Sequence, residues 1–293
     1  MDRRRALTAL AGATAAAGLA LPAAACPQAP DGEDAAGTRT TGFRQSVCYW
    51  PFSDVPLDEF AVAAKEMGLV AVDLLHADQW PVVAHHGLTC SMGNTSRRPD
   101  YLTRGLCDRS VHDVMVQEVE TALPLAVKAG VPNLIVLFGN RDGRSEEEGI
   151  ANAVECFDRM KRSAEDAGVT LCVEMLNSKV DHKEYQGDTT AFGVAVAEAV
   201  ASPRVKLLYD IYHMQVMEGD VIRTIRDHHQ HIAHYHTAGN PGRHELDDNQ
   251  ELQYGAIARA ITATGFTGYL AHEFIPTRDW QAGLRQAITV CSS

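Results

Sequence analysis

Four polar side chains end successive short apolar runs in the second half of the chain: Glu174 in VTLCVE, Asp210 in VKLLYD, His236 in HIAHYH and Glu273 in GYLAHE. Any one of them could simply cap a loop, but four successive runs ending in this way are hard to explain by loop chemistry. Three carboxylates brought together would repel one another and resist ionisation unless a cation lay between them. Two Glu, one Asp and one His form a mixed oxygen and nitrogen set that suits Mn²⁺, Mg²⁺, Co²⁺ or Zn²⁺. These residues therefore predict a divalent-metal site.

One of these residues lies in the polar stretch HYHTAGNPGRHELDD, residues 234–248. Arg243 falls in a tight loop of this stretch, where its planar guanidinium could hold a substrate carboxylate in a bidentate pair. The alternative is a surface arginine that closes the loop by pairing with Glu245 or Asp247. The sequence leaves both interpretations open.

Two histidines stand close to the expected ligands. His213 follows Asp210 by three residues, in what we expect to be a loop, and could hydrogen bond a substrate hydroxyl or carbonyl. Without further support, a loop histidine is more often incidental. His234 precedes His236 by two positions and faces the same side of a strand, so it either supports the metal ligand or belongs to the core.

Short apolar runs alternate with longer amphipathic segments along the chain. The expected strands are 45–50, 70–75, 87–94, 133–140, 169–177, 205–210, 231–237 and 268–274. The expected helices are 57–68, 110–130, 146–168, 189–201, 221–230, 254–264 and 279–288. Apolar strands that alternate with helices indicate a parallel sheet covered on both faces, and eight such units in about 250 residues indicate an α/β fold of the TIM (β/α)8 barrel type. The carboxyl ends of barrel strands converge, which would bring the four polar side chains together. An open doubly wound sheet is the alternative, but no GxGxxG follows the first strand.

The N-terminal segment does not share this pattern. Residues 1–25 carry three arginines, then a weakly apolar Ala/Leu/Gly run and small residues, and so predict a twin-arginine-like export signal. Cys26 could then be a lipid attachment point. Residues 26–42 combine Pro, Gly and charge without an apolar period and predict a flexible linker, which leaves the barrel to 43–293. We therefore expect an exported protein, periplasmic or on the outer face of the cell membrane.

Composition narrows the classes of partner. The formal net charge of −12 argues against a nucleic-acid partner, because phosphate contacts need clustered Lys and Arg. None of the seven cysteines belongs to a CxxC pair, which argues against a thiolate zinc site. Cys48, Cys90 and Cys172 lie in apolar strand-like runs, where we expect small buried hydrophobes.

Four motifs resemble the hydroxypyruvate isomerase branch of the xylose isomerase-like TIM barrels, whose relatives include ketose 3-epimerases. They are YDIYHMQVMEGD at 209–220, HTAGNPGRHELDD at 236–248, ELQY at 251–254 and GYLAHEF at 268–274. Two departures from that pattern are Met175, where relatives often have Pro, and His236, where some hydroxypyruvate isomerases carry Gln. His at this position is the epimerase-like choice.

The resemblance implies a role for each candidate site residue. Glu174, Asp210, His236 and Glu273 would hold a divalent ion, foremost Mn²⁺ or Mg²⁺, with Co²⁺ or Zn²⁺ as alternatives. Glu174 and Glu273 would also move the proton, and His213 and Arg243 would contact substrate. The implied reaction converts hydroxypyruvate to tartronate semialdehyde through an enediolate, whose developing negative charge a divalent cation stabilises.

Other functions remain open at this stage. A ketose 3-epimerase or sugar isomerase could use the same metal ligands. The two classes differ in the substrate pocket: a sugar needs stacking aromatics such as Trp50 or Trp80, whereas a keto acid needs a cation such as Arg243. A phosphodiesterase acting on abasic DNA would need a basic face, which the acidic charge disfavours. An exported sugar-binding lipoprotein without catalytic activity is a further alternative. We also expect that the barrel could form a homo-oligomer, as barrels of this class often do.

Overall fold

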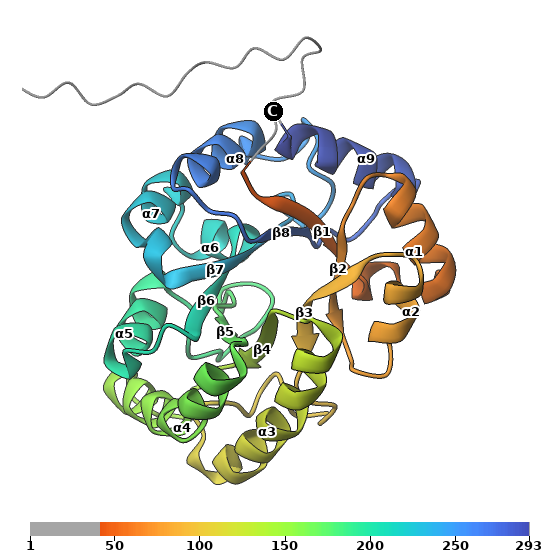
Figure 1. Cartoon of the computed structure of the whole chain (residues 1–293). Coiled ribbons are helices and arrows are strands. Elements are labelled where there is room, and N and C mark those ends of the chain that lie inside the picture. The colour runs from red at the N-terminus through yellow and green to blue at the C-terminus, as the bar shows by residue number, and fades with distance from the viewer. Residues whose placement is uncertain (1–41, 293) are drawn as a thin grey trace, which may run out of the picture. The chain divides into compact units, whose positions relative to one another are not determined.

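The computed structural model describes residues 42–292, in which eight parallel strands close into a barrel in sequence order (Figure 1). The strands are β1 (Arg44–Cys48), β2 (Ala71–Leu75), β3 (Thr89–Asn94), β4 (Asn133–Leu137), β5 (Thr170–Glu174), β6 (Val205–Asp210), β7 (Ile232–Thr237) and β8 (Tyr269–His272). Pairing of β8 with β1 closes the ring. The predicted TIM barrel is confirmed and the open sheet is excluded. The expected export signal, the lipid site at Cys26 and the linker up to residue 41 lie outside the described residues.

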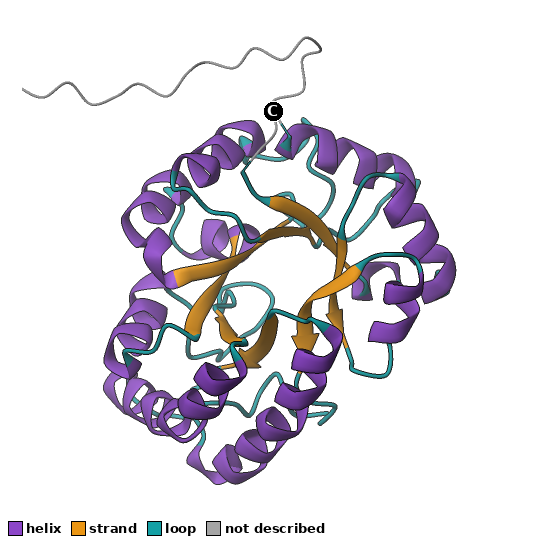
Figure 2. Ribbon diagram, viewed as in Figure 1, coloured by secondary structure: helices purple, strands orange, loops and turns teal. Residues whose placement is uncertain are grey.

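Helices surround the strands on the outside of the ring (Figure 2). They are α1 (Leu57–Glu66), α2 (Trp80–His85), α3 (His112–Ala129), α4 (Glu146–Ala167), α5 (Thr190–Val200), α6 (Ile211–Met217), α7 (Val221–His228), α8 (Tyr254–Ala263) and α9 (Trp280–Cys291), with 3-10 turns at η1 (Trp50–Phe52), η2 (Arg109–Val111) and η3 (His229–His231). Among the described helices, none has the length and apolar character needed to cross a bilayer.

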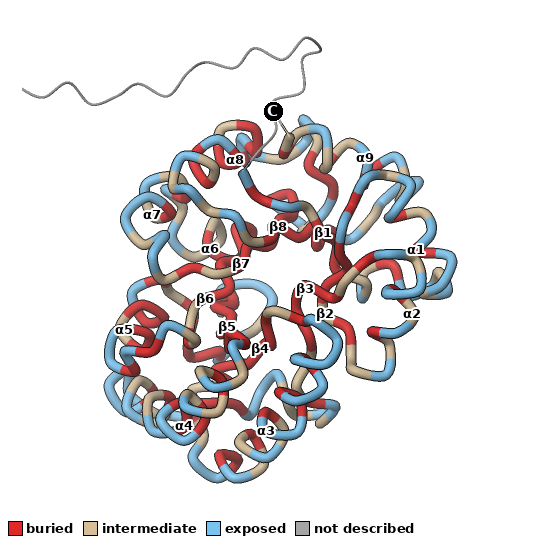
Figure 3. Tube along the Cα trace, viewed as in Figure 1, coloured by how far each residue is buried: buried red, intermediate tan, exposed pale blue. Residues whose placement is uncertain are grey.

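The apolar strands are buried because one face packs on the helices and the other fills the barrel. Every residue of β4 and β5 is buried, and Figure 3 shows this burial along the ring of strands while the outer faces of the helices are exposed. The cysteines of the described residues are free and buried, which confirms the prediction for Cys48, Cys90 and Cys172.

Two short helices were not expected from the sequence. α2 has only six residues and begins at Trp80 and a proline, so no amphipathic period develops. α6 begins directly after β6, where the Asp210 carboxylate accepts hydrogen bonds from the backbone N–H groups of Tyr212 and His213. His213 therefore lies in a helix, and the prediction of a loop at this position is wrong.

Candidate active site

Four side chains predicted as metal ligands converge at the carboxyl ends of β5 to β8. The ligand atoms of Glu174, Asp210, His236 and Glu273 all lie within 4.8 Å of one another, and all four residues are buried. Glu174 and Asp210 end their strands, His236 lies one residue before the end of β7, and Glu273 directly follows β8. Residues separated by about a hundred positions thus form one cluster because parallel strands end at the same rim.

The charges of this cluster fit a divalent cation. Atom Oε1 of Glu174 is buried and has no hydrogen-bond partner among the described residues. Burial, together with the carboxylates of Glu273 and Glu174, raises the pKa of Asp210 to about 7, although Arg243 opposes the shift. An unpartnered carboxylate oxygen and a carboxyl group that resists ionisation are what a metal-ligand set shows when no ion balances it. The donor set of three carboxylates and one imidazole therefore fits Mn²⁺ or Mg²⁺, with Co²⁺ and Zn²⁺ as alternatives.

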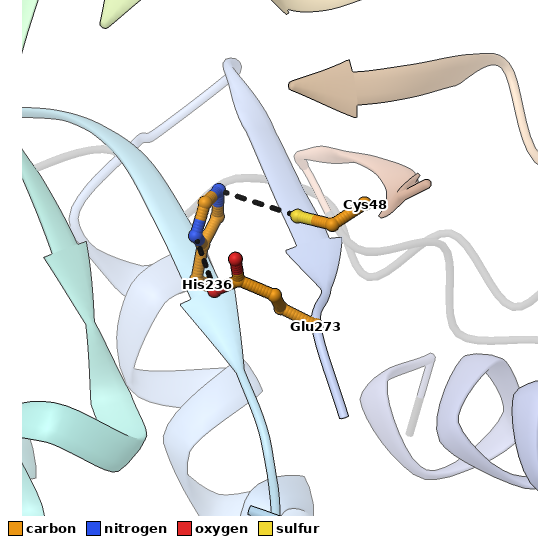
Figure 4. Close-up of side chains that lie close together, drawn as sticks. All are labelled: Cys48, His236 and Glu273. Carbon is orange, nitrogen blue, oxygen red and sulfur yellow. Dashed lines mark hydrogen bonds and ion pairs between the residues drawn. The ribbon is translucent and has the colours of Figure 1, made fainter. Parts of the chain in front are cut away.

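The two nitrogen atoms of the His236 ring contact different groups of residues. Its Nδ1 atom lies 2.8 Å from Oε2 of Glu273 and 3.7 Å from Oε1 of Glu174. Its Nε2 atom lies on the other side of the ring, 3.7 Å from Sγ of Cys48 (Figure 4). The same atom lies 3.4 Å from Oδ2 of Asp73. Nδ1 is therefore the atom that this ring offers to an ion held by the two glutamates.

Arg243 reaches into the cluster. Its guanidinium lies 2.7 Å from Oε2 of Glu273 and 3.4 Å from Oδ2 of Asp210, and its side chain is only 12% exposed. It packs near the rings of Trp50 and Tyr212, with the guanidinium carbon 5.2 Å and 5.6 Å from the ring centroids. Although burial favours the protonated form, Arg243 and His236 hold the pKa of Glu273 well below its ordinary value.

The surface interpretation of Arg243 is excluded by the partners of the neighbouring acids. Glu245 accepts hydrogen bonds from Thr277, and Asp247 pairs with Arg278. Arg243 itself has a φ of 60°, a left-handed conformation that is uncommon outside glycine and that collects at functional sites. The loop thus directs the arginine inward.

His213 lies against the same cluster. It is fully buried, its Nδ1 atom lies 2.6 Å from the Asn177 side-chain amide, and its Nε2 atom lies 3.6 Å from Oδ2 of Asp210. Burial and the charge of Arg243 lower the pKa of His213 well below its ordinary value, so the ring is neutral. The backbone N–H of Asn177 donates to Nδ1 at 3.3 Å, so Nε2 carries the proton of the neutral ring, and Nε2 has no hydrogen-bond partner among residues 42–292. A neutral ring with a free N–H suits contact with a substrate oxygen.

Of the two tryptophans named as stacking aromatics only Trp50 lies at the cluster, and His182 is a nearby residue that the sequence did not single out. Trp50 donates its indole N–H to Oε1 of Glu273 at 2.6 Å, and His182 lies with its ring centroid 5.3 Å from that of His213. Trp80, named with Trp50 as a stacking aromatic, is instead buried and donates to the carbonyl of Leu75, so it is a core residue. His182 lies in a polar loop after β5, and nothing in its sequence context distinguishes it.

The raised pKa of Asp210 predicts how metal affinity depends on pH. Below pH 7 this carboxyl group holds a proton that an incoming ion must displace, so the affinity should rise with pH by about tenfold per unit or more up to about pH 7. Although burial favours the neutral ring, Cys48 and Glu273 raise the pKa of His236 well above its ordinary value, so its Nδ1 must also lose a proton to bind the ion and the rise should continue above pH 7. Isothermal titration with Mn²⁺ at several values between about pH 5 and pH 8, in buffers of different ionisation enthalpy, measures both the affinity and the protons released. A flat profile with no proton release would contradict this expectation.

Comparison with known proteins places the chain in a family. Residues 39–291 match the family model described as xylose isomerase-like TIM barrel. The chain is 24% identical over 263 residues to a putative hydroxypyruvate isomerase of Mus musculus, with 88% of each chain covered. It is also 24% identical over 249 residues to the 2-oxo-tetronate isomerase of Pectobacterium atrosepticum, with 80% of this chain and 92% of the relative covered.

A solved structure shows the same fold. A protein from Brucella melitensis described as AP endonuclease, family 2, has a TM-score of 0.77 and 24% identity to this chain, and the match covers 85% of this chain and 99% of that one. The relatives named as isomerases confirm the predicted resemblance and the prediction that the chain is an enzyme of the isomerase kind. Because the family match spans nearly the whole described barrel, the chain belongs to the xylose isomerase-like TIM barrel family.

Proposed function

We propose that the protein is a metal-dependent isomerase that moves a proton between neighbouring carbons of a small hydroxy-carbonyl compound, with hydroxypyruvate as substrate and tartronate semialdehyde as product. The observation that carries the proposal is the convergence of Glu174, Asp210, His236 and Glu273 within 4.8 Å, with Arg243 beside them. Relatives that bear the names hydroxypyruvate isomerase and 2-oxo-tetronate isomerase support the same class of reaction.

The two glutamates divide the proton transfer between them. When bound, a divalent ion stabilises negative charge that develops on the substrate oxygens. Glu174 has a buried oxygen without a hydrogen-bond partner among the described residues, so this carboxylate is the better placed to take a proton from carbon. Glu273 comes from β8, three strands further round the ring, and is fixed by Trp50, His236 and Arg243. It faces the substrate from a second side, takes up the proton of the substrate hydroxyl and delivers it to the neighbouring carbon, while Glu174 passes the proton that it took from carbon to the former carbonyl oxygen.

Arg243 and His213 orient the substrate in this proposal. The guanidinium supplies two parallel N–H groups for a carboxylate, and the neutral imidazole supplies one N–H for a carbonyl or hydroxyl oxygen. A keto acid uses both contacts, whereas an uncharged ketose has no carboxylate for the arginine.

The direct test is to follow hydroxypyruvate and a panel of ketoses by NMR in the presence of Mn²⁺. Conversion of hydroxypyruvate to tartronate semialdehyde is the expected result. Conversion of a ketose alone would favour the epimerase, and binding without any conversion would favour a sugar-binding protein.

Replacing Arg243 with Lys should raise the KM for hydroxypyruvate by at least about tenfold and affect kcat less, because an ammonium cannot form the bidentate pair. Steady-state kinetics of Arg243→Lys measures the split. Arg278→Lys is the matched control, since Arg278 pairs with Asp247 and its side chain is 44% exposed. An unchanged KM for the keto acid would contradict a carboxylate contact at Arg243.

A further inference from the structure

We propose that Asp73 is a positioning residue for His236: its carboxylate holds the Nε2–H of the imidazole and thereby turns Nδ1 toward Glu174 and Glu273 as the metal-binding atom. This inference rests on the metal site of the proposed function. It concerns a residue of β2, on a different part of the ring from the four ligands.

The first observation is the geometry of the His236 ring. Nδ1 faces the glutamates, and Nε2 faces Oδ2 of Asp73 at 3.4 Å. Both residues have fully buried side chains, so water does not compete for this contact. A histidine that binds a metal through one nitrogen almost always donates the other N–H, which fixes the tautomer and the direction of the ring.

The second observation is how the backbone presents Asp73. The pairing of β2 with β3 shifts register on both sides of Asp73, which marks a bulge. The next residue, Leu74, has a φ of 58°, a left-handed conformation that is a genuine outlier for a bulky side chain. Bulges commonly re-aim one side chain, and strain of this kind persists where the surrounding structure requires it. Here the re-aimed side chain is the buried carboxylate of Asp73.

The third observation is that other residues hold Asp73 in place. His234 approaches Oδ2 of Asp73 through Nε2 at 2.5 Å, and the Ser91 hydroxyl donates to Oδ1. His234 and Ser91 are fully buried and bind none of the four ligands by hydrogen bonds. They contact Asp73 from β7 and β3, and this contact gives His234 a role that the sequence left open.

Cys48 is the competing partner of Nε2: its Sγ lies 3.7 Å away with the geometry of a hydrogen bond, whereas Oδ2 of Asp73 lies at an ion-pair distance of 3.4 Å (Figure 4 shows Cys48). A thiol is a weak donor and a weak acceptor, whereas a carboxylate forms a charge-assisted hydrogen bond of about twice the strength of a neutral one. We therefore assign the positioning role to Asp73 and expect the thiol to contribute packing.

The test measures metal affinity independently of turnover. In the full chain, Asp73→Asn should weaken the binding of Mn²⁺ by about 10 to 100-fold while circular dichroism shows an intact fold. Ser91→Ala should weaken it by a smaller factor, and Cys48→Ala should leave it within about twofold. Asp188→Asn is the matched control, because Asp188 is a buried acid that pairs with Arg141 and Ser178 and is not a member of the ligand cluster.

Each of three results would overturn the inference: an Asp73→Asn affinity within twofold of the wild type, an equal loss in Cys48→Ala, or two ions bound per chain. The last would mean that Asp73, His234 and His236 hold a second ion. If Asp73→Asn fails to fold, ¹⁵N NMR of the Zn²⁺-loaded wild type tests the inference instead. The spectrum should show that Nε2 of His236 carries the proton and that Nδ1 binds the ion. The reverse assignment would contradict the proposal.

Failure of this inference can be told apart from failure of the proposed function. A protein that binds one ion with the expected dependence on Asp73 but converts no substrate would retain the inference and lose the isomerase. A wild type that binds no ion at all would remove both.

Discussion

Replacing Glu174 or Glu273 with Gln is expected to reduce kcat by about 10² to 10⁴-fold, the range that a positioned general acid or base contributes. The amide keeps the size of the side chain and one oxygen that can contact an ion, but it can neither take up nor deliver a proton. Steady-state kinetics of the metal-loaded variants measures the loss, and metal content measured on the same samples separates lost proton transfer from lost ion.

Glu245→Gln is the control for Glu273→Gln. Glu245 is a buried glutamate at 3% exposure that binds Thr277 and stands outside the ligand cluster. Its variant should retain kcat within a few-fold. If either Glu174→Gln or Glu273→Gln kept more than about a tenth of the wild-type kcat with the ion bound, that glutamate would not be a proton-transfer residue.

Removing the divalent ion is expected to lower turnover by at least about 10³-fold, because the ion supplies several kcal/mol of charge stabilisation in the transition state. Dialysis against a chelator followed by stepwise return of Mn²⁺, Mg²⁺, Co²⁺ or Zn²⁺ measures both the loss and the preferred ion. Turnover that persists in a sample shown to be metal-free would contradict metal dependence.

The same titration should raise the thermal unfolding temperature. An ion that binds only the folded chain adds about 2.7 kcal/mol to the free energy of unfolding at a concentration of about 100 times Kd. It also relieves the repulsion among Glu174, Asp210 and Glu273, which lie together in a buried site. Asp210→Asn serves as the control, since this variant should show a smaller shift at the same ion concentration.

The fold and the ligand cluster could be predicted because each depends on a local pattern. Continuous apolar runs mark strands that are covered on both faces, and the polar residue that ends a run marks the rim of a parallel barrel. Glu174, Asp210 and Glu273 could therefore be brought together without knowledge of any distance.

Other parts of the site depend on tertiary geometry that the sequence does not display. Arg243 could face the surface or the site, and the choice depends on a left-handed residue in its loop. The direction of Asp73 follows from the bulge in β2, although a lone carboxylate inside the run VAVDLL was a signal that could have marked it. Trp50 reaches Glu273 because β1 ends early and the chain turns into η1.

The first measurement to make is solvent deuterium incorporation into hydroxypyruvate and a panel of ketoses, with the protein from residue 43 in the presence of Mn²⁺ and again after chelation. Metal-dependent exchange at one carbon beside the carbonyl of hydroxypyruvate is the predicted result. It would establish proton transfer at this site and identify the substrate class together. No exchange across the panel, in protein shown to hold the ion, would contradict the isomerase and favour a protein that binds its ligand without converting it.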